Sequence, residues 1–385
     1  MFSNADFMYM QRALALAARG MYTTTPNPRV GCVLVKDGAV IGEGFTQPAG
    51  GAHAEIQALH DARTRGHDPS GATAYVSLEP CSHFGRTPPC AKALIEAQIA
   101  QVVSALEDPN PLVSGQGLAL LRAAQIDVRC GLLAHEAYEL NLGFISRMTR
   151  HRPWVRVKIA ASLDGRTALP SGESQWITSS AARADSHLWR ARACAILTGI
   201  GTVRTDNPQL TVRGVDTPRQ PLRVLVDSRL EVPLDAHVLN GHAPLLIVCA
   251  SLDATRAQKA HALRARGAEV ISLANHSSAQ VDLPALLHLL GERGINELHV
   301  EAGPSLNGAL LQQHCIDELL IYLAPSLLCD ALGMFKLAAP ASLAQRVTLS
   351  FQSVERVGRE LRILARVGAL GDNDKTEREC AIDTA

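Results

Sequence analysis

Two short segments decide how the first half of this sequence is interpreted. They read His53-Ala54-Glu55 and Glu79-Pro80-Cys81-Ser82-His83-Phe84-Gly85-Arg86-Thr87-Pro88-Pro89-Cys90. A catalytic zinc ion needs three protein ligands and a fourth position open to water, and His53, Cys81 and Cys90 supply such a set. Glu55, two residues after His53, could project beside the metal without binding it, and a carboxylate in that position can act as general acid and base. We therefore expect a catalytic Zn²⁺ site with Glu55 as its proton carrier.

The local structure expected around these segments supports a metal site. His53 begins an amphipathic helix that ends near Gly66, Cys81 follows a strand over 73–78, and Cys90 opens a helix over 91–100. A thiolate at a helix N-terminus is stabilised by free backbone N–H groups and by the helix dipole. Taken alone, a triplet such as His53-Ala54-Glu55 is more often an ordinary solvated helix start, and two cysteines are more often thiols packed in a core. Their order and their strand–loop–helix setting favour the metal site.

The remainder of the first half alternates between helices and strands. A helix is expected from Asp6, as its N-cap, to Gly20. Strands are expected over 29–35 and 39–46, joined by a hairpin turn at Asp37-Gly38, and again over 101–106. A helix over 133–150 follows. This alternation predicts an α/β sandwich up to about residue 130.

A second α/β pattern begins after His151-Arg152-Pro153, where we place the domain boundary. Its strands are expected over 154–160, 195–198, 222–227, 245–250, 298–300 and 319–323. Residues 1–150 and 151–370 then form two domains, and the polar stretch 371–385 is expected to be a disordered tail. The segment Gly199-Ile200-Gly201-Thr202-Val203-Arg204 lacks the last glycine of a Rossmann fingerprint. The turn over 301–306 could receive a pyrophosphate or be a plain strand-to-helix turn.

Composition narrows the class of protein. The 385 residues include 37 basic and 37 acidic side chains, which argues against binding of nucleic acid through phosphate contacts and favours small substrates. The N-terminus does not resemble a secretory signal, and no apolar run approaches the length of a membrane span. The nine cysteines are scattered and odd in number, which fits reduced thiols. The sequence thus predicts a cytoplasmic protein without membrane partners.

Several segments together resemble a known family. The long cysteine loop, Thr25-Pro26-Asn27-Pro28 and Glu107-Asp108-Pro109-Asn110-Pro111 are similar to the deaminase half of the bifunctional riboflavin biosynthesis enzymes. Lys158, Ser162-Leu163-Asp164-Gly165-Arg166, Ser174-Gln175-Trp176-Ile177-Thr178 and 199–213 resemble the reductase half, in the same order. These enzymes are a diaminohydroxyphosphoribosylaminopyrimidine deaminase joined to a 5-amino-6-(5-phosphoribosylamino)uracil reductase. The wide spacing of Cys81 and Cys90, unlike the Cys-x-x-Cys of other zinc nucleobase deaminases, is a mark of this family.

The resemblance carries expectations about fold and chemistry. It implies an N-terminal cytidine-deaminase-like three-layer sandwich and a C-terminal domain that resembles dihydrofolate reductase. It implies Zn²⁺ and NADPH as cofactors, and a small phosphorylated pyrimidine substrate that is first deaminated and then reduced from ribose to ribitol. The sequence does not determine the oligomeric state, and a homo-oligomer is possible. No residue stands out as the proton donor in the reduction.

The resemblance also assigns residues to each ligand. The residues implied to hold the substrate are Asn27, His83, Asp108 and Asn110 in the first half, and Lys158, Ser174, Arg190, Leu210, Arg213 and Glu301 in the second. The residues implied to contact the dinucleotide are Ala160, Trp176, Thr202, Asp206, Ser228, Gly303, Pro304, Ser305 and Leu306.

Each assignment has a simpler alternative. Asn27 and Asn110 lie beside prolines and could serve only turn chemistry, and His83 could be a solvent-facing loop residue. Arg190 and Arg213 offer forked donors for a ribose phosphate but could be surface arginines. Ser228-Arg229 could bind the phosphate that distinguishes NADPH from NADH, although Asp227 would oppose that charge.

Two other functions compete with this interpretation. A nucleic-acid or nucleoside deaminase with an accessory second domain would share the zinc chemistry, but the neutral charge and the second half argue against it. A scaffold that keeps zinc only for stability would close the fourth metal position and would not need Glu55.

Overall fold

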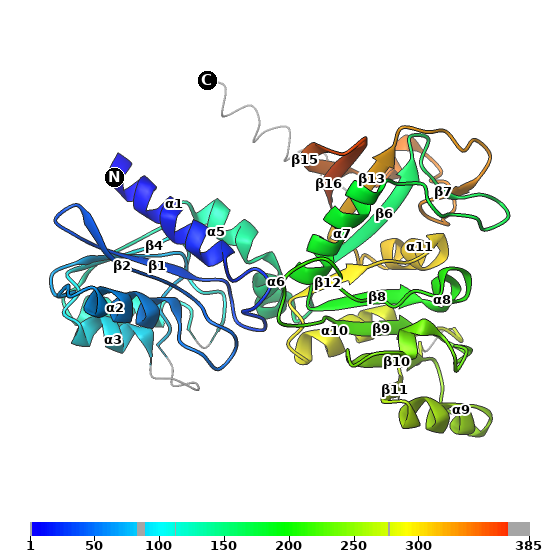
Figure 1. Cartoon of the computed structure of the whole chain (residues 1–385), viewed down its shortest axis with the longest axis horizontal. Coiled ribbons are helices and arrows are strands. Elements are labelled where there is room, and N and C mark those ends of the chain that lie inside the picture. The colour runs from blue at the N-terminus through cyan, green and yellow to red at the C-terminus, as the bar shows by residue number, and fades with distance from the viewer. Residues whose placement is uncertain (1, 83–88, 112, 276–277, 369–385) are drawn as a thin grey trace. The chain divides into compact units, whose positions relative to one another are not determined.

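The computed structural model describes residues 2–82, 89–111, 113–275 and 278–368. The chain divides into two compact units. Unit 1 comprises Met1–Pro153 with the short segments Thr217–Arg219 and Leu290–Asn296, and unit 2 comprises the remaining residues (Figure 1). The tail expected over 371–385 lies outside the described residues.

Unit 1 is built on a five-stranded mixed sheet. Its order is β2 (Ala39–Phe45), β1 (Gly31–Lys36), β3 (Thr73–Val76), β4 (Gln101–Ser104) and β5 (Asp127–Cys130). β1 is antiparallel to β2 and to β3, whereas β3, β4 and β5 run parallel. The predicted hairpin turn at Asp37-Gly38 is confirmed, and both residues have the positive φ that such a turn requires.

Helices cover both faces of this sheet. Val33 and Val35 of β1 pack with α1 (Asn4–Ala18) and α5 (Ala134–Leu140), while Cys32 and Leu34 pack on the other face. That other face is covered by α2 (Ala54–Thr64), α3 (Cys90–Glu96), α4 (Gln116–Ala123) and α6 (Leu142–Arg150). The period of two along β1 therefore separates two apolar layers. The three-layer sandwich predicted for the first half is confirmed.

One glycine fixes how closely α2 approaches the sheet. A Cβ at Gly44 of β2 would lie only 2.3 Å from the carbonyl oxygen of Ala54. Because Ala54 is the first residue of α2, the small glycine lets the start of this helix rest on the sheet. That helix start is where His53 and Glu55 are found.

Two boundaries differ from the sequence prediction. The first helix is capped by Ser3, not by Asp6, because Ser3 and Asp6 form a reciprocal capping box. The helix expected over 133–150 is two helices that meet at Asn141. The Asn141 side chain accepts the Arg29 N–H at 2.8 Å and donates to the Arg29 carbonyl at 2.9 Å, so tertiary pairing is made where the helix breaks.

Unit 2 contains a nine-stranded sheet. Its order is β11 (Ala268–Ser272), β10 (Leu245–Cys249), β9 (Leu222–Val226), β8 (Ala195–Gly199), β12 (Glu297–Val300), β6 (Trp154–Ser162), β13 (Glu318–Ala324), β16 (Glu360–Val367) and β15 (Leu349–Val357). The first seven run parallel, and β16 and β15 form an antiparallel edge. The helices in this part of the chain are α7 (Ser180–Arg192), α8 (Ile200–Asp206), α9 (Ala254–Ala265), α10 (Leu283–Glu292) and α11 (Pro304–Gln312). β7 (Arg166–Ala168) and β14 (Leu332–Gly333) pair separately.

All six strands predicted in the second half are present, but β7, β11, β14, β15 and β16 were not predicted. Most residues of β15 are exposed on both faces, so its sequence lacks the apolar alternation by which strands are recognised.

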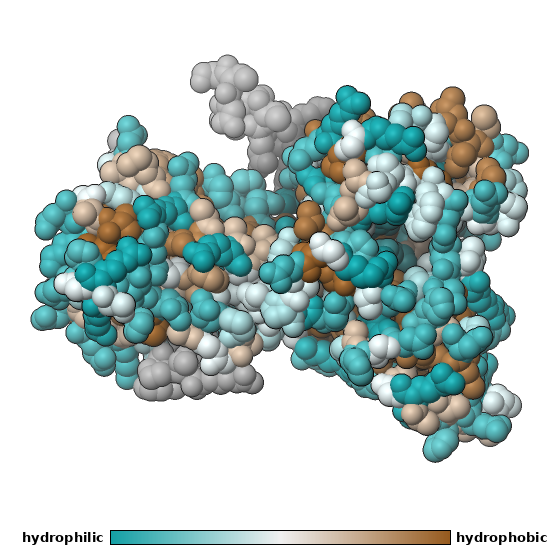
Figure 2. Space-filling model, in the orientation of Figure 1, coloured by the Kyte–Doolittle hydropathy of each residue, from teal (hydrophilic) through white to brown (hydrophobic). Residues whose placement is uncertain are grey.

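Figure 2 shows brown side chains over the segment that follows β13, where Leu327, Leu332 and Leu337 are exposed. None of the helices in the described parts of the chain combines the length and the hydrophobicity needed to cross a bilayer.

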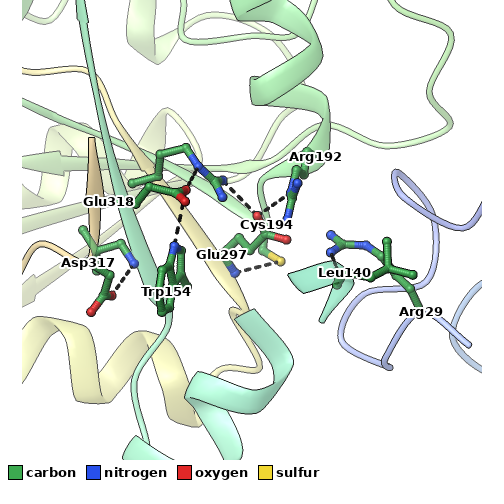
Figure 3. A network of polar contacts seen from close by, with 10 residues as sticks. Arg29, Leu140, Trp154, Arg192, Cys194, Glu297, Asp317 and Glu318 are labelled. Atoms are coloured by element: carbon green, nitrogen blue, oxygen red, sulfur yellow. Dashed lines mark hydrogen bonds and ion pairs between the residues drawn. The ribbon is translucent and has the colours of Figure 1, made fainter. Parts of the chain in front are cut away.

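A buried network of charges joins the central strands of unit 2. Arg156 of β6 is 1% exposed, and its guanidinium contacts Glu297 of β12 at 2.9 Å and Glu318 of β13 at 2.5 Å. Arg192 reaches the same Glu297 at 2.7 Å, and the indole N–H of Trp154 points to Glu318 (Figure 3). Each buried carboxylate thus has a cationic partner from a neighbouring element.

Replacing Arg156 with methionine should strongly destabilise unit 2. The substitution leaves two buried carboxylates short of a cation, and breaking such a pair costs ~3–5 kcal/mol. Chemical denaturation followed by fluorescence would measure the loss. Arg204→Ala removes an exposed ion pair with Glu231 and is the matched control, with an expected cost below ~1 kcal/mol. Equal losses in the two variants would contradict the structural role of the buried network.

Candidate active sites

The topology of unit 1 brings its candidate residues to one edge of the sheet. The C-terminal ends of β2, β3 and β4 and the N-terminal end of β1 share that edge, because β1 is antiparallel to both of its neighbours. The segments that leave this edge carry His53 after β2, Cys81 after β3 and Asp108 after β4. Asn27 precedes β1 at the same edge.

His53, Cys81 and Cys90 form a cluster whose ligand atoms all lie within 4.8 Å of one another. The His53 Nδ1 atom is 3.6 Å from the Cys81 sulfur and 3.4 Å from the Cys90 sulfur. A tetrahedral zinc with Zn–S of about 2.3 Å and Zn–N of about 2.0–2.1 Å places such atoms about 3.6 Å apart. The residue types and their spacing therefore fit Zn²⁺.

The charges around this cluster suit metal binding and proton transfer. The pKa of Cys81 is lowered from its ordinary value, because its sulfur accepts hydrogen bonds from the Cys90 thiol, from His53 and from the Cys90 backbone N–H at 3.3 Å. The first amide of α3 therefore stabilises the Cys81 thiolate. Glu55 is only 3% exposed, and burial, together with the charge of Cys81, raises its pKa to about 7.

The structure places only some of the expected substrate residues of unit 1 near the cluster. Asp108 is buried near the cluster, and burial, with the charges of Glu79 and Cys81, raises its pKa to about 6. Its carboxylate accepts the Asn110 backbone N–H at 2.8 Å, which links the two residues. Asn27 makes a local turn, in which its N–H donates to the Thr24 carbonyl at 3.0 Å. His83 lies outside the described residues.

In unit 2, the candidate residues line one large cavity. Its volume is about 1710 Å³, which exceeds the roughly 300–1,000 Å³ of a usual single-ligand pocket and leaves room for a dinucleotide and a substrate together. The cavity lies where β8, β9 and β12 end, since residues 199–202, 226–229 and 301–306 line it. The lining residues named from the sequence are Lys158, Ala160, Ser174, Trp176, Arg190, Thr202, Asp206, Leu210, Arg213, Ser228, Glu301, Gly303, Pro304, Ser305 and Leu306.

Two of the expected substrate residues bind each other. Arg190 donates to both oxygens of Glu301, at 2.5 and 2.8 Å, and its third nitrogen donates to the Thr211 carbonyl at 2.9 Å. Although burial favours the neutral acid, Arg190 holds the pKa of Glu301 well below its usual range. The fork of Arg190 is thus committed to a carboxylate, while Arg213 contacts the Thr211 hydroxyl at 3.0 Å.

Burial lowers the pKa of Lys158, on the cavity wall, below its ordinary value, and the neighbouring Arg190 lowers it further, while Glu301 opposes the shift. The cavity wall therefore presents a partly balanced group of charges, with Lys158, Arg190 and Arg213 facing Glu301. Such a group can hold an anionic substrate without an excess of unpaired cations.

Four of the dinucleotide candidates, Gly303, Pro304, Ser305 and Leu306, form the N-terminus of α11, and the others line the same cavity. Gly303 is the N-cap of this helix and Pro304 is its first residue, so the first N–H groups of the helix remain available to a ligand phosphate. Ser174 and Asp206 are joined by a hydrogen bond of 3.3 Å. Trp176 is 67% exposed, with the Arg183 guanidinium 4.3 Å from its ring centroid.

Asp227 interferes less with phosphate binding than its position in the sequence suggests. Its carboxylate accepts the Val232 N–H at 2.7 Å, and burial raises its pKa. Arg229, beside Ser228, is 68% exposed in its side chain and pairs with Glu231 at 3.1 Å. An anionic ligand group can therefore approach Arg229 from solvent.

His187 is a cavity residue that sequence reasoning missed. Its Nδ1 accepts the Arg213 backbone N–H at 3.1 Å, so its remaining ring nitrogen carries the proton. Burial and the charges of Arg190 and Arg213 lower its pKa to about 4, which keeps it neutral. The available signal was its position on α7, three residues before Arg190, since residues three apart on a helix share a face.

Comparisons with known proteins match both halves of the chain. Residues 3–106 match the family model of the cytidine and deoxycytidylate deaminase zinc-binding region, and residues 153–363 match that of the RibD C-terminal domain. The riboflavin biosynthesis protein RibD of Escherichia coli is 45% identical over 94% of this chain and 100% of its own length. The RibD of Aquifex aeolicus is 40% identical over 94% and 99%.

Solved structures show the same architecture. RibD of Acinetobacter baumannii has a TM-score of 0.86 at 42% identity, over 95% of this chain and 99% of its own. A diaminohydroxyphosphoribosylaminopyrimidine deaminase/5-amino-6-(5-phosphoribosylamino)uracil reductase of Thermotoga maritima has a TM-score of 0.84 at 34% identity, over 94% and 99%. These matches extend through both units, so the chain belongs to the RibD family of riboflavin biosynthesis proteins, in which a zinc-binding deaminase domain is followed by a reductase domain.

Proposed function

We propose that this chain performs the two reactions named for its Thermotoga maritima relative, and that each unit holds one of them. The deaminase replaces an amino group of the phosphorylated diaminopyrimidine with oxygen and releases ammonia. The reductase then converts the ribose of the product to ribitol with NADPH. The observation that carries the proposal is the fit of His53, Cys81 and Cys90 to Zn²⁺ with buried Glu55 beside them.

In the deaminase, His53, Cys81 and Cys90 are the metal ligands and Glu55 is the general acid and base. Zn²⁺, when bound, supplies a water molecule of lowered pKa. Glu55 accepts a proton from that water and delivers protons to the ring nitrogen and to the departing amine, as the C–O bond forms and the C–N bond breaks. Burial of Glu55 raises its pKa above the ordinary value of a carboxyl group, which suits a side chain that both accepts and delivers protons. Asn27, His83, Asp108 and Asn110 hold the pyrimidine.

In the reductase, the cavity of unit 2 holds NADPH and the deaminated intermediate. NADPH supplies a hydride to the sugar carbon that becomes part of the ribitol chain. Arg213 offers a forked donor to the ribose phosphate, while Glu301 fixes the orientation of Arg190. Lys158, Ser174 and Leu210 complete the substrate side. The N-terminus of α11, with Ala160, Trp176, Thr202, Asp206 and Ser228, receives the dinucleotide.

The remaining proposals concern domains, compartment and partners. We assign residues 1–150 to the deaminase and 151–370 to the reductase. The zinc ligands Cys81 and Cys90 must be reduced to bind metal, which favours the cytoplasm. Nucleic acid is not a partner, because the net charge is zero. A mobility-shift assay with RNA or DNA would detect a nucleic-acid deaminase if this assignment were wrong.

The zinc assignment is tested by Cys81→Ser. Losing one of three ligands leaves an incomplete shell, so zinc content and ammonia release should fall together. Elemental analysis and an ammonia assay would measure both. NADPH oxidation with the deaminated intermediate serves as the control, because the reductase cavity lies in unit 2. Unchanged zinc in the variant would rule out Cys81 as a ligand.

The separation of the two activities is tested by Glu55→Gln and Arg213→Ala. Glutamine keeps the size of Glu55 but cannot carry protons, so zinc should remain bound while ammonia release falls by about 10²-fold or more. This variant should consume NADPH only when it is given the deaminated intermediate. Arg213→Ala should release ammonia and accumulate that intermediate.

Product mass analysis with each substrate, with and without NADPH, would distinguish these patterns. NADPH oxidation by Glu55→Gln on the diamino substrate would overturn the order of deamination before reduction. Loss of both activities in a folded Glu55→Gln protein would overturn their separation.

Cofactor preference is tested by Arg229→Ala. A charge-assisted hydrogen bond contributes ~1.5–3 kcal/mol, so the Kd for NADPH should rise by about tenfold or more while the Kd for NADH changes little. Fluorescence titration would measure both constants. Arg204→Ala is the matched control, since Arg204 pairs with the same Glu231 at 3.0 Å. If both cofactors lose affinity equally, Arg229 does not determine the preference.

A further inference from the structure

A buried glutamate beside the zinc cluster organises a whole loop. Glu79 follows β3 and is 3% exposed. One of its carboxylate oxygens accepts the backbone N–H groups of Asp108 at 3.0 Å and Gly115 at 2.9 Å. The other accepts those of Gly117 at 2.8 Å and Leu118 at 3.2 Å. Four main-chain donors of one segment therefore converge on a single side chain.

These bonds fix the segment that carries two of the proposed pyrimidine contacts. The Asp108 N–H is bound directly to Glu79, and the Asp108 carboxylate in turn accepts the Asn110 N–H at 2.8 Å. The Glu79 N–H itself donates at 2.9 Å to the carbonyl of Leu106, two residues after the end of β4. The positions of Asp108 and Asn110 thus depend on Glu79, which lies two residues before the metal ligand Cys81.

Two glycines at the start of α4 allow its backbone to approach the Glu79 carboxylate. A Cβ at Gly117 would lie 1.9 Å from the Pro80 carbonyl oxygen, so only glycine allows the start of α4 to approach so closely. Gly115 has a φ of 77°, which directs the chain into that helix. Two glycines therefore bring the donors of the loop onto Glu79.

A carboxylate suits this position better than an amide does. Its two oxygens together have about four acceptor sites, which match the four N–H donors. A glutamine would offer one oxygen and would direct its own N–H groups at two of those donors. The substitution is nearly isosteric, so it removes acceptors without creating a cavity.

We propose that Glu79 is a positioning residue of the deaminase, which holds Asp108 and Asn110 in register with the zinc ligands. The role rests on the proposed function, in which Asp108 and Asn110 hold the pyrimidine. Glu79 reaches the substrate only through them. Its loss should therefore act on substrate binding more than on metal binding or on the catalytic step.

The test compares Glu79→Gln with the unaltered full-length protein loaded with zinc. We expect the KM for the diamino substrate to rise about tenfold or more. Zinc content and NADPH oxidation with the deaminated intermediate should stay unchanged, and kcat should change less than KM. Glu79→Asp, which keeps the charge, should recover part of the lost affinity.

A double-mutant cycle separates positioning from general damage to the fold. In a background that carries both Asp108→Ala and Asn110→Ala, Glu79→Gln should have a much smaller effect on KM, because both side chains that it positions are absent. Tyr75→Phe is the matched control, since it removes a buried hydrogen bond of 2.6 Å to Asp6 elsewhere in unit 1. It should lower the melting temperature without raising KM.

The outcomes separate the two proposals. If Glu79→Gln raises KM no more than Tyr75→Phe does, or if its effect is unchanged when Asp108 and Asn110 are both alanine, the positioning role is overturned. If Asn110→Ala and Asp108→Ala leave KM unaltered in an active enzyme, the proposed pyrimidine contacts themselves fail. Should Glu79→Gln not fold, Gly115→Ala perturbs the same loop from the other side, and an unchanged KM there would refute the proposal.

Discussion

Strands that run in the same direction within one sheet deliver their C-terminal ends to one edge of it, and both candidate sites depend on that constraint. In unit 1, the edge collects the segments that follow β2, β3 and β4, which carry His53, Cys81 and Asp108. In unit 2, it collects the ends of β8, β9 and β12 around a single cavity. Residues far apart in sequence meet there because the strands leave their connecting loops at the same place.

At such an edge, the chemical role of a buried carboxylate depends on the groups that it contacts. Glu55 and Glu79 are both 3% exposed. Glu79 accepts four backbone N–H groups, which suits a fixed anion that organises a loop. Burial and the charge of Cys81 raise the pKa of Glu55 to about 7, which suits a group that gains and loses a proton. Two equally buried glutamates, each two residues away from a candidate zinc ligand, thus differ in their chemistry because their partners differ.

The sequence predicted those features that depend on local pattern or on a motif. The hairpin at Asp37-Gly38 and the central strands of unit 2 follow from turn chemistry and apolar periodicity. The three layers of unit 1 follow from the family resemblance. The break at Asn141 could not be predicted, because its cause is a pair of hydrogen bonds to Arg29. The four donors on Glu79 were equally hidden, since they come from a segment joined to it only through tertiary contacts.

The pairing of Arg190 with Glu301 changes how the reductase cavity is understood. Sequence reasoning treats both as independent contacts to the substrate, yet each satisfies the other across two hydrogen bonds. Releasing Arg190 to a phosphate would leave the Glu301 carboxylate buried without its main partner, which is costly. Binding the phosphate through Arg213 would avoid this cost, because Arg213 has no carboxylate partner in these hydrogen bonds: it contacts the Thr211 hydroxyl, and its backbone N–H donates to the neutral His187. In the proposed reductase, the paired Glu301 and Arg190 would form a fixed part of the cavity wall, and the more exposed Arg213 would supply the charge for the phosphate.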